Sequence, residues 1–244
     1  MLHTQWSGKK IAFLGDSITD KNHIGTSQNY WQILEEQLGI IPFVYAVNGH
    51  NWSHIPSQIN ELETEIGNNL DAIFIFMGTN DYNSSRPLGK WWILKEEEVN
   101  NNGTIKKKMR RSPDMDPTTF RGLINFNMAY LKEHFPLQQI VLLTPIHRGF
   151  ACFSETNIQP EESYPNDIGL YLDSYITVIR ETSSIWAVPV IDLYCLSGLF
   201  PITDSHGLFF HDAANDRLHP NVNGHKRIAQ TILYQMLTLP ASFR

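Results

Sequence analysis

Short runs of apolar, β-branched and aromatic residues recur along the chain, and none alternates with polar residues as a half-exposed strand would. A continuous apolar run bounded by turn residues is typical of a strand that is covered on both faces. The pattern therefore predicts buried parallel strands. They cover residues 11–15, 43–47, 72–77, 140–144 and 188–192.

Between these runs, apolar residues recur three or four positions apart, which is the period of one helix face. The first two such patterns end at Gly39 and Gly67, and glycine commonly follows the last turn of a helix. Helices are predicted on Trp31/Leu34/Leu38, Ile59/Leu62/Ile66, Phe120/Leu123/Ile124/Leu131, Ile168/Leu172/Tyr175/Ile179 and Ile228/Leu233/Leu237.

The alternation of strands and helices predicts an α/β fold. Successive βαβ units with right-handed crossovers give a parallel sheet with helices on both faces, a three-layer α/β/α sandwich. Pro189 lies in the fifth apolar run, and because proline cannot donate to a strand ladder, that strand is expected at a sheet edge. The strand order 2-1-3-4-5 places it there. At 244 residues, the chain is expected to be a single domain over residues 1–244.

Residues 90–111 interrupt this alternation and predict an inserted β-hairpin. Asn102 and Gly103 are the residues that favour a tight hairpin turn. With that turn, Glu98 would face Lys107 and Glu97 would face Lys108, so the basic run is interpreted as one side of a hairpin rather than a nucleic-acid patch. Trp91 and Trp92 would lie at its base, available to a ligand or to a partner chain in a homo-oligomer.

Composition limits the partners and the location of the protein. With 19 Lys and Arg against 25 Asp and Glu, the formal charge is −6, which argues against nucleic acid as a partner. No apolar run is long enough for a bilayer span, so no membrane partner is expected. The first ten residues contain no apolar signal region, and the chain as given is expected in the cytoplasm, with export open for a form whose signal peptide had been removed.

Polar turns follow the first three predicted strands, and they hold the candidate chemistry. The carboxyl ends of parallel strands meet at one edge, where ligands bind in such sheets. Ser17 follows the first strand, Gly49 the second and Asn80 the third. Asp216 and His219, just before the last helix, are three residues apart, so a single turn could place the carboxylate beside the imidazole.

These residue types suit nucleophilic catalysis. A serine hydroxyl is a weak nucleophile unless a histidine takes its proton, and a carboxylate orients that histidine. Ser17, His219 and Asp216 are the candidates for these roles. The backbone N–H groups of Ser17 and Gly49 and the side-chain amide of Asn80 are candidates for an oxyanion hole.

Four blocks of the sequence resemble those of the SGNH hydrolases, also called the GDSL esterase/lipase family. They are Gly15-Asp16-Ser17-Ile18, Val47-Asn48-Gly49, Gly78-Thr79-Asn80-Asp81 and Asp216-Arg217-Leu218-His219-Pro220. The resemblance spans nearly the whole chain. It implies a flavodoxin-like fold, a Ser17 nucleophile activated by His219 and Asp216, and an oxyanion hole from Ser17, Gly49 and Asn80. Ile18 stands where the family name has leucine, and the residues after Gly49 are larger than is common in the family.

The predicted function is a cofactor-independent serine esterase that acts through an acyl-enzyme. The predicted substrate-binding residues form a polar and aromatic set, which favours short acyl esters, such as acetyl esters of carbohydrate or small alcohols. They are His50, Trp52, Tyr82, His147 and Arg148. A lipase or lysophospholipase-type acylhydrolase of the same family is the alternative.

Two hypotheses from other classes stay open. Six potential ligands between residues 204 and 219 suggest a metal-dependent phosphoesterase, although the chain has no HExxH motif and the serine reading implies no metal. Trp52, Trp91 and Trp92 suggest a catalytically silent carbohydrate-binding protein. A nucleotide cofactor is not expected, because neither GxGxxG nor GxxxxGK[ST] occurs.

Overall fold

The computed structural model describes residues 3–243 and contains a parallel sheet of five strands. The strands lie in the order β2-β1-β3-β6-β9, which is the predicted order 2-1-3-4-5. They are β1 (Lys10–Gly15), β2 (Ile41–Val44), β3 (Ala72–Phe76), β6 (Gln139–Leu143) and β9 (Val190–Ile191). The α/β/α prediction is confirmed.

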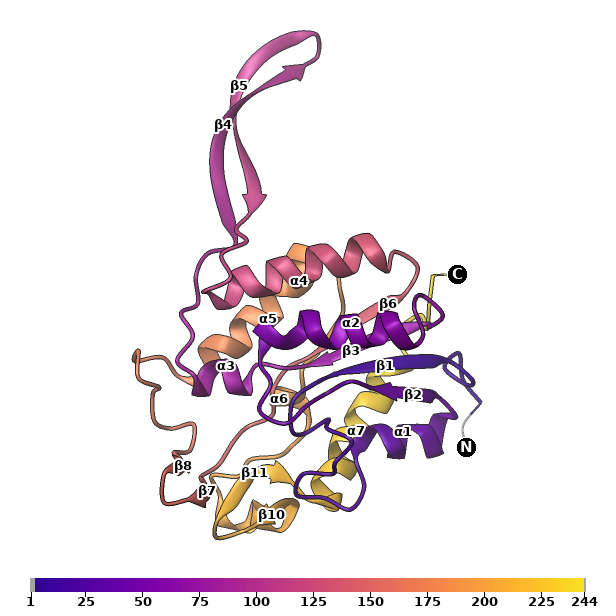
Figure 1. Cartoon of the computed structure of the whole chain (residues 1–244), viewed down its shortest axis with the longest axis vertical. Helices are drawn as coiled ribbons and strands as arrows, with labels where there is room; N and C mark the ends of the chain where they lie inside the picture. Colours follow the sequence, from indigo (N-terminus) through magenta and orange to yellow (C-terminus); the bar gives the residue numbers. More distant parts are fainter. Residues whose placement is uncertain (1–2, 244) are drawn as a thin grey trace.

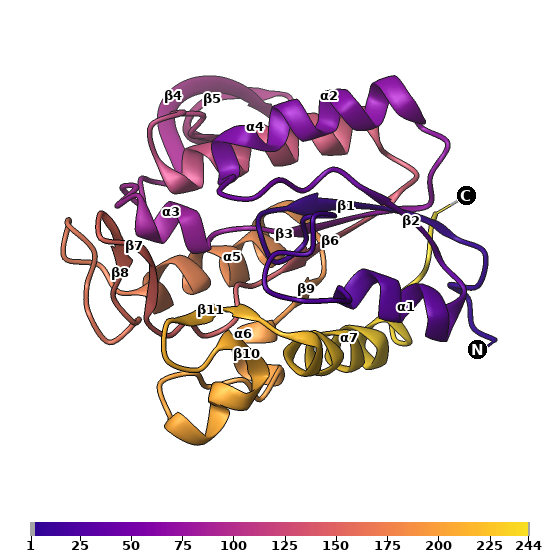
Figure 2. The same cartoon turned by 60° about the horizontal axis from the view of Figure 1, so that its bottom comes forward.

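Helices cover both faces of this sheet (Figures 1 and 2). The helices packed on one face are α2 (Ile55–Glu65), α4 (Phe120–His134) and α5 (Leu172–Trp186). On the other face lie α1 (Tyr30–Leu38) and α7 (Val222–Met236), with the short α6 (Leu193–Leu196).

The two covered faces explain why the strands are apolar throughout. Successive side chains of a strand point to opposite faces, so both kinds of position need an apolar residue here. In β1, Ala12 and Leu14 pack under α2, α4 and α5, while Ile11 and Phe13 pack under α1 and α7. Burying these two cores supplies the main favourable term for folding.

The second strand differs from its prediction in both position and burial. It was expected to be buried at residues 43–47, but β2 begins at Ile41 and ends at Val44, and Ile41 is exposed. Because β2 is an edge strand, Pro42 is tolerated within it. The fifth strand also begins later than predicted, after Pro189, whose carbonyl accepts a hydrogen bond from the Leu142 N–H.

A second, antiparallel sheet was not predicted. Its strands are β7 (Ala151–Ser154), β8 (Asn157–Gln159), β10 (Phe210–Asp212) and β11 (Asp216–Pro220), in the order β10-β11-β7-β8. Three short helical segments complete the fold: η1 (Trp52–His54), α3 (Thr79–Asn83) and η2 (Asp204–Phe209). Figures 1 and 2 place the second sheet away from both chain ends.

The inserted hairpin is present and projects from the body (Figure 1). It consists of β4 (Trp92–Asn101) and β5 (Thr104–Pro113), so it ends two residues later than predicted. Asn102 and Gly103 have φ angles of 54° and 80°, as a tight hairpin turn requires. Glu98 pairs with Lys107 and Glu97 with Lys108 in the strand register, but the ion pairs are diagonal, Lys107 with Glu96 and Arg110 with Glu97.

Among residues 3–243, no helix combines the length and the apolar character that crossing a bilayer requires.

Candidate active site

The site begins at the turn after β1. Gly15 allows this turn because a Cβ there would lie 2.8 Å from the Phe76 carbonyl oxygen of the neighbouring β3. The backbone N–H groups of Thr19 and Asp20 then donate to the carbonyl of Asp16, which closes the turn around Ser17. The Ser17 side chain is thereby held at the carboxyl edge of the sheet, as the sequence predicted for strand ends.

Ser17, His219 and Asp216 form a hydrogen-bonded chain. His219 Nε2 lies 3.0 Å from Ser17 Oγ, and His219 Nδ1 lies 2.9 Å from Asp216 Oδ2. All three residues are buried. Since Nδ1–H donates to the carboxylate, Nε2 is left as the acceptor for the Ser17 hydroxyl.

The local structure that joins Asp216 to His219 differs from the predicted turn. Both residues lie on β11, and in a regular strand residues three apart point to opposite faces. Here Asp212 pairs with Asp216 and Phe210 with Pro220, so β11 has extra residues between its pairs and bends as a bulge does. Asp216 Oδ1 secures the bend by accepting the backbone N–H groups of Leu218 and His219 at 3.1 and 3.0 Å.

These contacts set the charge of Asp216. Burial by itself would raise the pKa of this carboxyl, but the His219 ring and the two backbone N–H donors outweigh that effect and lower it. Asp216 is therefore an anion at neutral pH. It holds the imidazole in one tautomer and would stabilise the imidazolium that forms when His219 takes a proton.

The predicted oxyanion donors lie on neighbouring loops. Gly49 adopts a φ of 79°, a conformation that favours glycine, and the preceding Asn48 N–H donates to Asp20 Oδ2 at 2.7 Å. Asn80 is the second residue of α3 and donates one side-chain N–H to the His50 carbonyl at 2.8 Å. An amide has a second hydrogen, which remains for an oxyanion. Neither Ser17 nor Gly49 donates its backbone N–H to another residue of the described chain.

Two buried carboxyl groups beneath this edge differ from Asp216. Burial raises the pKa of Asp16 to about 7, and the neighbouring Asp81 charge adds to the shift. Burial also raises the pKa of Asp81 to about 7, against the Trp52 N–H and the Arg86 guanidinium, which both bond to it. Of the two, Asp81 is the one that forms an ion pair, with Arg86 at 3.0 Å.

The five predicted substrate-binding residues fall into two groups, three that are buried and two that are partly exposed. Trp52 is only 1% exposed and packs against Phe120, so placing it in the cleft was wrong. Tyr82 and Arg148 are also buried, with the guanidinium over the Tyr82 ring at 5.3 Å and its Nη2 donating to Gln159. They form part of the wall behind the site and not its surface.

The other two predicted residues are partly exposed. His50 stacks on His54 with ring centroids 4.3 Å apart, and burial followed by the His54 charge lowers its pKa. His147 is hydrogen-bonded to Glu162 and lies against the Tyr194 ring. His50 is next to the Gly49 loop and so borders the oxyanion donors.

The sequence did not indicate two residues of the site, Gln58 and Phe153. Gln58, a polar residue on the apolar face of α2, accepts the Gly15 N–H at 2.9 Å and donates to both the Gly15 carbonyl and His50 Nδ1. It ties the β1 turn to the Gly49 loop. Phe153 lies on the unpredicted β7 with its ring 5.4 Å from that of His219, and it is 44% exposed. The polar position on an apolar helix face could have indicated Gln58, but no sequence signal indicated Phe153.

The six potential metal ligands between residues 204 and 219 do not form one cluster in the structure. Across residues 3–243, no group of three or more His, Cys, Asp or Glu side chains is arranged to hold a metal ion. Asp204 pairs with Arg217 at 2.9 Å, His206 accepts the Phe200 N–H, and Asp212 accepts the Ala214 N–H. Asp216 and His219 bond to each other.

Comparisons with known proteins agree with the fold and the sequence blocks. A model of the GDSL-like lipase/acylhydrolase family matches residues 13–227. A comparison with curated proteins finds no match.

Solved structures share the fold. A protein from Lactobacillus plantarum is 24% identical with a TM-score of 0.74, and the match covers 95% of this chain and 98% of that one. A protein described as a possible lipase from Chitinophaga pinensis is 20% identical with a TM-score of 0.67, covering 95% and 99%. Axe2, an acetylxylan esterase from Geobacillus stearothermophilus, is 18% identical with a TM-score of 0.55, covering 94% of each chain.

Proposed function

Because this chain belongs to the GDSL-like lipase/acylhydrolase family and is an ester-bond hydrolase, we propose that it is a serine esterase that removes short acyl groups, acetyl above all, from carbohydrates or small alcohols. The observation that carries the proposal is the chain of two hydrogen bonds, 3.0 Å from Ser17 to His219 and 2.9 Å from His219 to Asp216. No step of the proposed reaction uses a cofactor.

The acylation step follows from this geometry. His219 Nε2 takes the proton of Ser17 Oγ while Oγ forms a bond to the ester carbonyl carbon. One C–O electron pair moves to the carbonyl oxygen, where the N–H groups of Ser17, Gly49 and Asn80 receive it. When the C=O bond forms again, the bond to the alcohol oxygen breaks, and His219 gives the alcohol its proton.

Deacylation repeats the sequence with water. His219 takes a proton from the water as its oxygen bonds to the acyl carbon. The bond from that carbon to Ser17 Oγ then breaks, and Oγ regains the proton from His219. The carboxylic acid leaves, and the enzyme returns to its first state.

The space around Ser17 supports a short acyl group. The narrow space behind the site has no free volume for an acyl chain, and it is lined by Asp16, Ile18, Phe76, Thr79, Pro145, Ile146, Arg148 and Leu218. Four larger cavities have volumes of about 100 to 450 Å³, and neither Ser17 nor His219 lines any of them. The exposed Phe153 ring beside His219 offers a flat apolar face for the alcohol part, such as a sugar ring.

A chain-length series tests the substrate class. We expect kcat/KM to be highest for p-nitrophenyl acetate and to fall at least tenfold by the octanoate, with release of acetate from acetylated xylose. Ser17→Ala is the control and should abolish both activities, while a metal chelator should leave them unchanged. A maximum at the octanoate would favour the lipase-type alternative, and loss of activity with the chelator would favour the metal-dependent one.

A further inference from the structure

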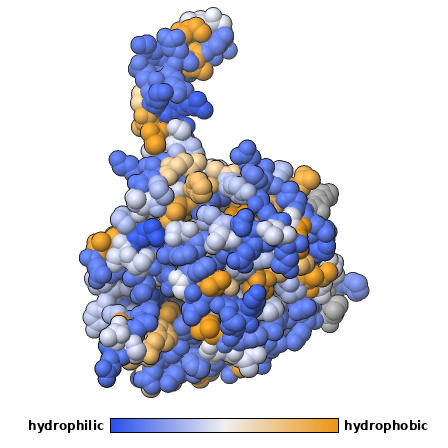
Figure 3. All heavy atoms as spheres, viewed as in Figure 1, coloured by the Kyte–Doolittle hydropathy of each residue, from blue (hydrophilic) through white to orange (hydrophobic). Residues whose placement is uncertain are grey.

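The β4–β5 hairpin, called the arm below and defined as Trp92–Pro113, stands clear of the body (Figures 1 and 3). Its base is fixed. Trp91 donates its ring N–H to Glu181 at 2.6 Å, and the Asn125 amide donates to the carbonyls of Trp91 and Asp114. The arm is therefore held at one end, and its outer part extends into solvent.

An arm of this kind is poorly stabilised alone. A two-stranded hairpin is marginally stable in water, and both of its edges present unpaired backbone groups. Five large apolar side chains of the arm are also between 43 and 61% exposed, namely Ile93, Leu94, Val99, Ile105 and Met109. These features are expected of a surface that another molecule covers.

The strand register gives the arm two different faces. Residues that pair across the strands share a face, so Lys95 and Arg110, Glu97 and Lys108, and Val99 and Lys106 lie on one side. That side, called the basic face, carries four cations against one anion, together with Ile93 and Val99. The opposite face balances Lys107 and Arg111 against Glu96 and Glu98 and carries the other three apolar side chains, Leu94, Ile105 and Met109.

The charge of the arm is opposite to that of the body. The arm has six basic and three acidic side chains, a formal charge of +3, while the whole chain has −6, so the remainder has −9. This asymmetry would attract the arm of one molecule to the body of another at low ionic strength.

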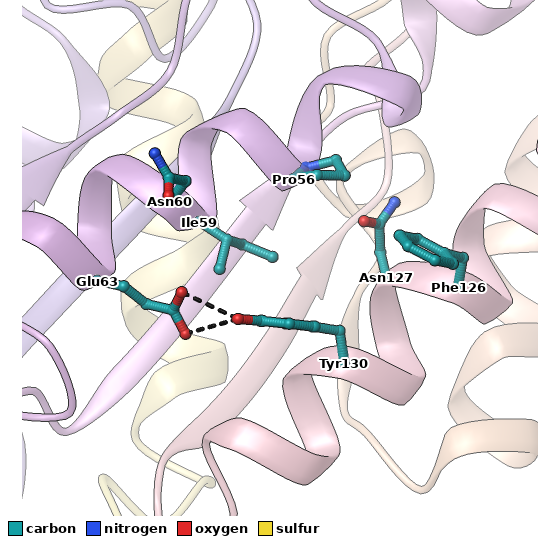
Figure 4. Close-up of a pocket in the computed structure, with 7 residues that line it drawn as sticks. All are labelled: Pro56, Ile59, Asn60, Glu63, Phe126, Asn127 and Tyr130. Atoms are coloured by element: carbon teal, nitrogen blue, oxygen red, sulfur yellow. Dashed lines mark hydrogen bonds between the residues drawn. The ribbon is translucent and has the colours of Figure 1, made fainter.

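One surface of the body combines an apolar hollow with an acidic side chain. A cavity of about 230 Å³ lies between α2 and α4, with an apolar lining from Pro56, Ile59 and Phe126, the last 48% exposed (Figure 4). Glu63 faces this cavity and accepts the Tyr130 hydroxyl at 2.9 Å. Glu63 is the glutamate of α2 at this cavity, and the helix has no Lys or Arg, while Glu61 and Glu65 lie on its other side, near Tyr45.

We propose that the basic face of the arm docks on the α2–α4 surface of a second copy of this chain, and that two copies exchange arms about a two-fold axis. Ile93 and Val99 meet the apolar lining, while the cations of the basic face meet Glu63. Such a reciprocal contact uses the same two patches on each copy, as two-fold symmetry requires.

Charge reversal with a matched control tests this contact. Size-exclusion chromatography with light scattering at low salt should give twice the chain mass of 28.0 kDa for the natural protein. Lys106→Glu/Lys108→Glu should give the single-chain mass. Lys107→Glu/Arg111→Glu, which makes the same charge change on the opposite face, should stay dimeric.

Mixing two reversed proteins locates the second half of the contact. Asn60→Lys/Glu63→Lys should be monomeric by itself, and mixing it with Lys106→Glu/Lys108→Glu should restore a species of twice the chain mass, which high salt dissociates. A monomeric natural protein, a dimer that survives the basic-face reversal, or a mixture that stays monomeric would each overturn the proposal. Esterase assays of the same variants report separately on the proposed function.

Discussion

Two carboxyl groups at the same sheet edge, Asp216 and Asp16, are both buried, and yet their pKa values shift in opposite directions. Asp216 has a lowered pKa, because its two oxygens accept the His219 ring and two backbone N–H groups. Burial raises the pKa of Asp16 to about 7, because the Ile18 N–H, which bonds to its carboxyl at 3.2 Å, offsets little of that effect and the nearby Asp81 charge adds to it. Burial acts against the charged form in both cases, and only at Asp216 do the donors outweigh it.

The difference separates two roles within one site. The ionised Asp216 acts on His219 and, through it, on Ser17. Asp16, with a pKa of about 7, carries less negative charge at neutral pH than Asp216 does. A second full negative charge at this edge of the sheet would oppose the charge that develops on the carbonyl oxygen.

The two groups also predict opposite effects of pH on stability. The folded state of Asp216 releases its proton more readily than the unfolded chain, so its contribution is present above about pH 4 and is lost as the pH falls. Asp16 holds its proton more tightly when folded. Its contribution is therefore present below about pH 4 and is lost as the pH rises toward 7.

The largest expected effect comes from removing the charge of Asp216. Asp216→Asn keeps the shape of the side chain but favours the wrong tautomer of His219, so kcat should fall by roughly 10⁴ while the protein stays folded. The measurement is steady-state hydrolysis of p-nitrophenyl acetate, with circular dichroism as the control for folding. A loss smaller than tenfold would mean that the Asp216 charge does not act on the reaction.

A smaller effect is expected at Asn80, a proposed oxyanion donor that is neither of the two carboxyl groups compared above. Asn80→Ala should lower kcat by roughly 10² to 10³ and change KM little, because the amide would bind the transition state and not the ground state. The residue also donates to the His50 carbonyl, a bond that both Asn80→Ala and the size-matched Asn80→Asp lose, so circular dichroism of both variants is the control for folding. If either variant kept the full rate, Asn80 would have no place in the oxyanion hole.

The smallest effect is on stability and concerns Asp16. Asp16→Asn removes the titrating group but keeps an oxygen for the Ile18 N–H. The stability of the natural protein relative to this variant should decrease between pH 4 and 7, with a slope of up to about 1.4 kcal/mol per pH unit. Urea unfolding at several pH values measures this difference, and a difference independent of pH would show that Asp16 is ionised throughout.

The sheet and the site could be predicted because their signals are local. Ala12, Phe13 and Leu14 are apolar at successive positions, which only a sheet covered on both faces requires. The turn residues Ser17, Gly49 and Asn80 each follow a predicted strand directly, so the topology alone brings them to one edge.

The remaining parts depend on pairings that leave no local signal. The bend that brings Asp216 to His219 depends on the pairing of β10 with β11, and strands of three to five residues show no clear period. Trp52 looked like a cleft residue because it follows the Gly49 loop, but η1 turns its ring inward against Phe120. Phe153 could not be found because β7 was not predicted.

The central claim is that Ser17 is a nucleophile activated by His219 and Asp216. Intact-mass spectrometry after incubation with a fluorophosphonate tests it most directly, with Ser17→Ala as the control. The account predicts one adduct on the natural protein and none on the variant. A folded natural protein that gains no adduct, or a variant that gains the same one, would contradict it.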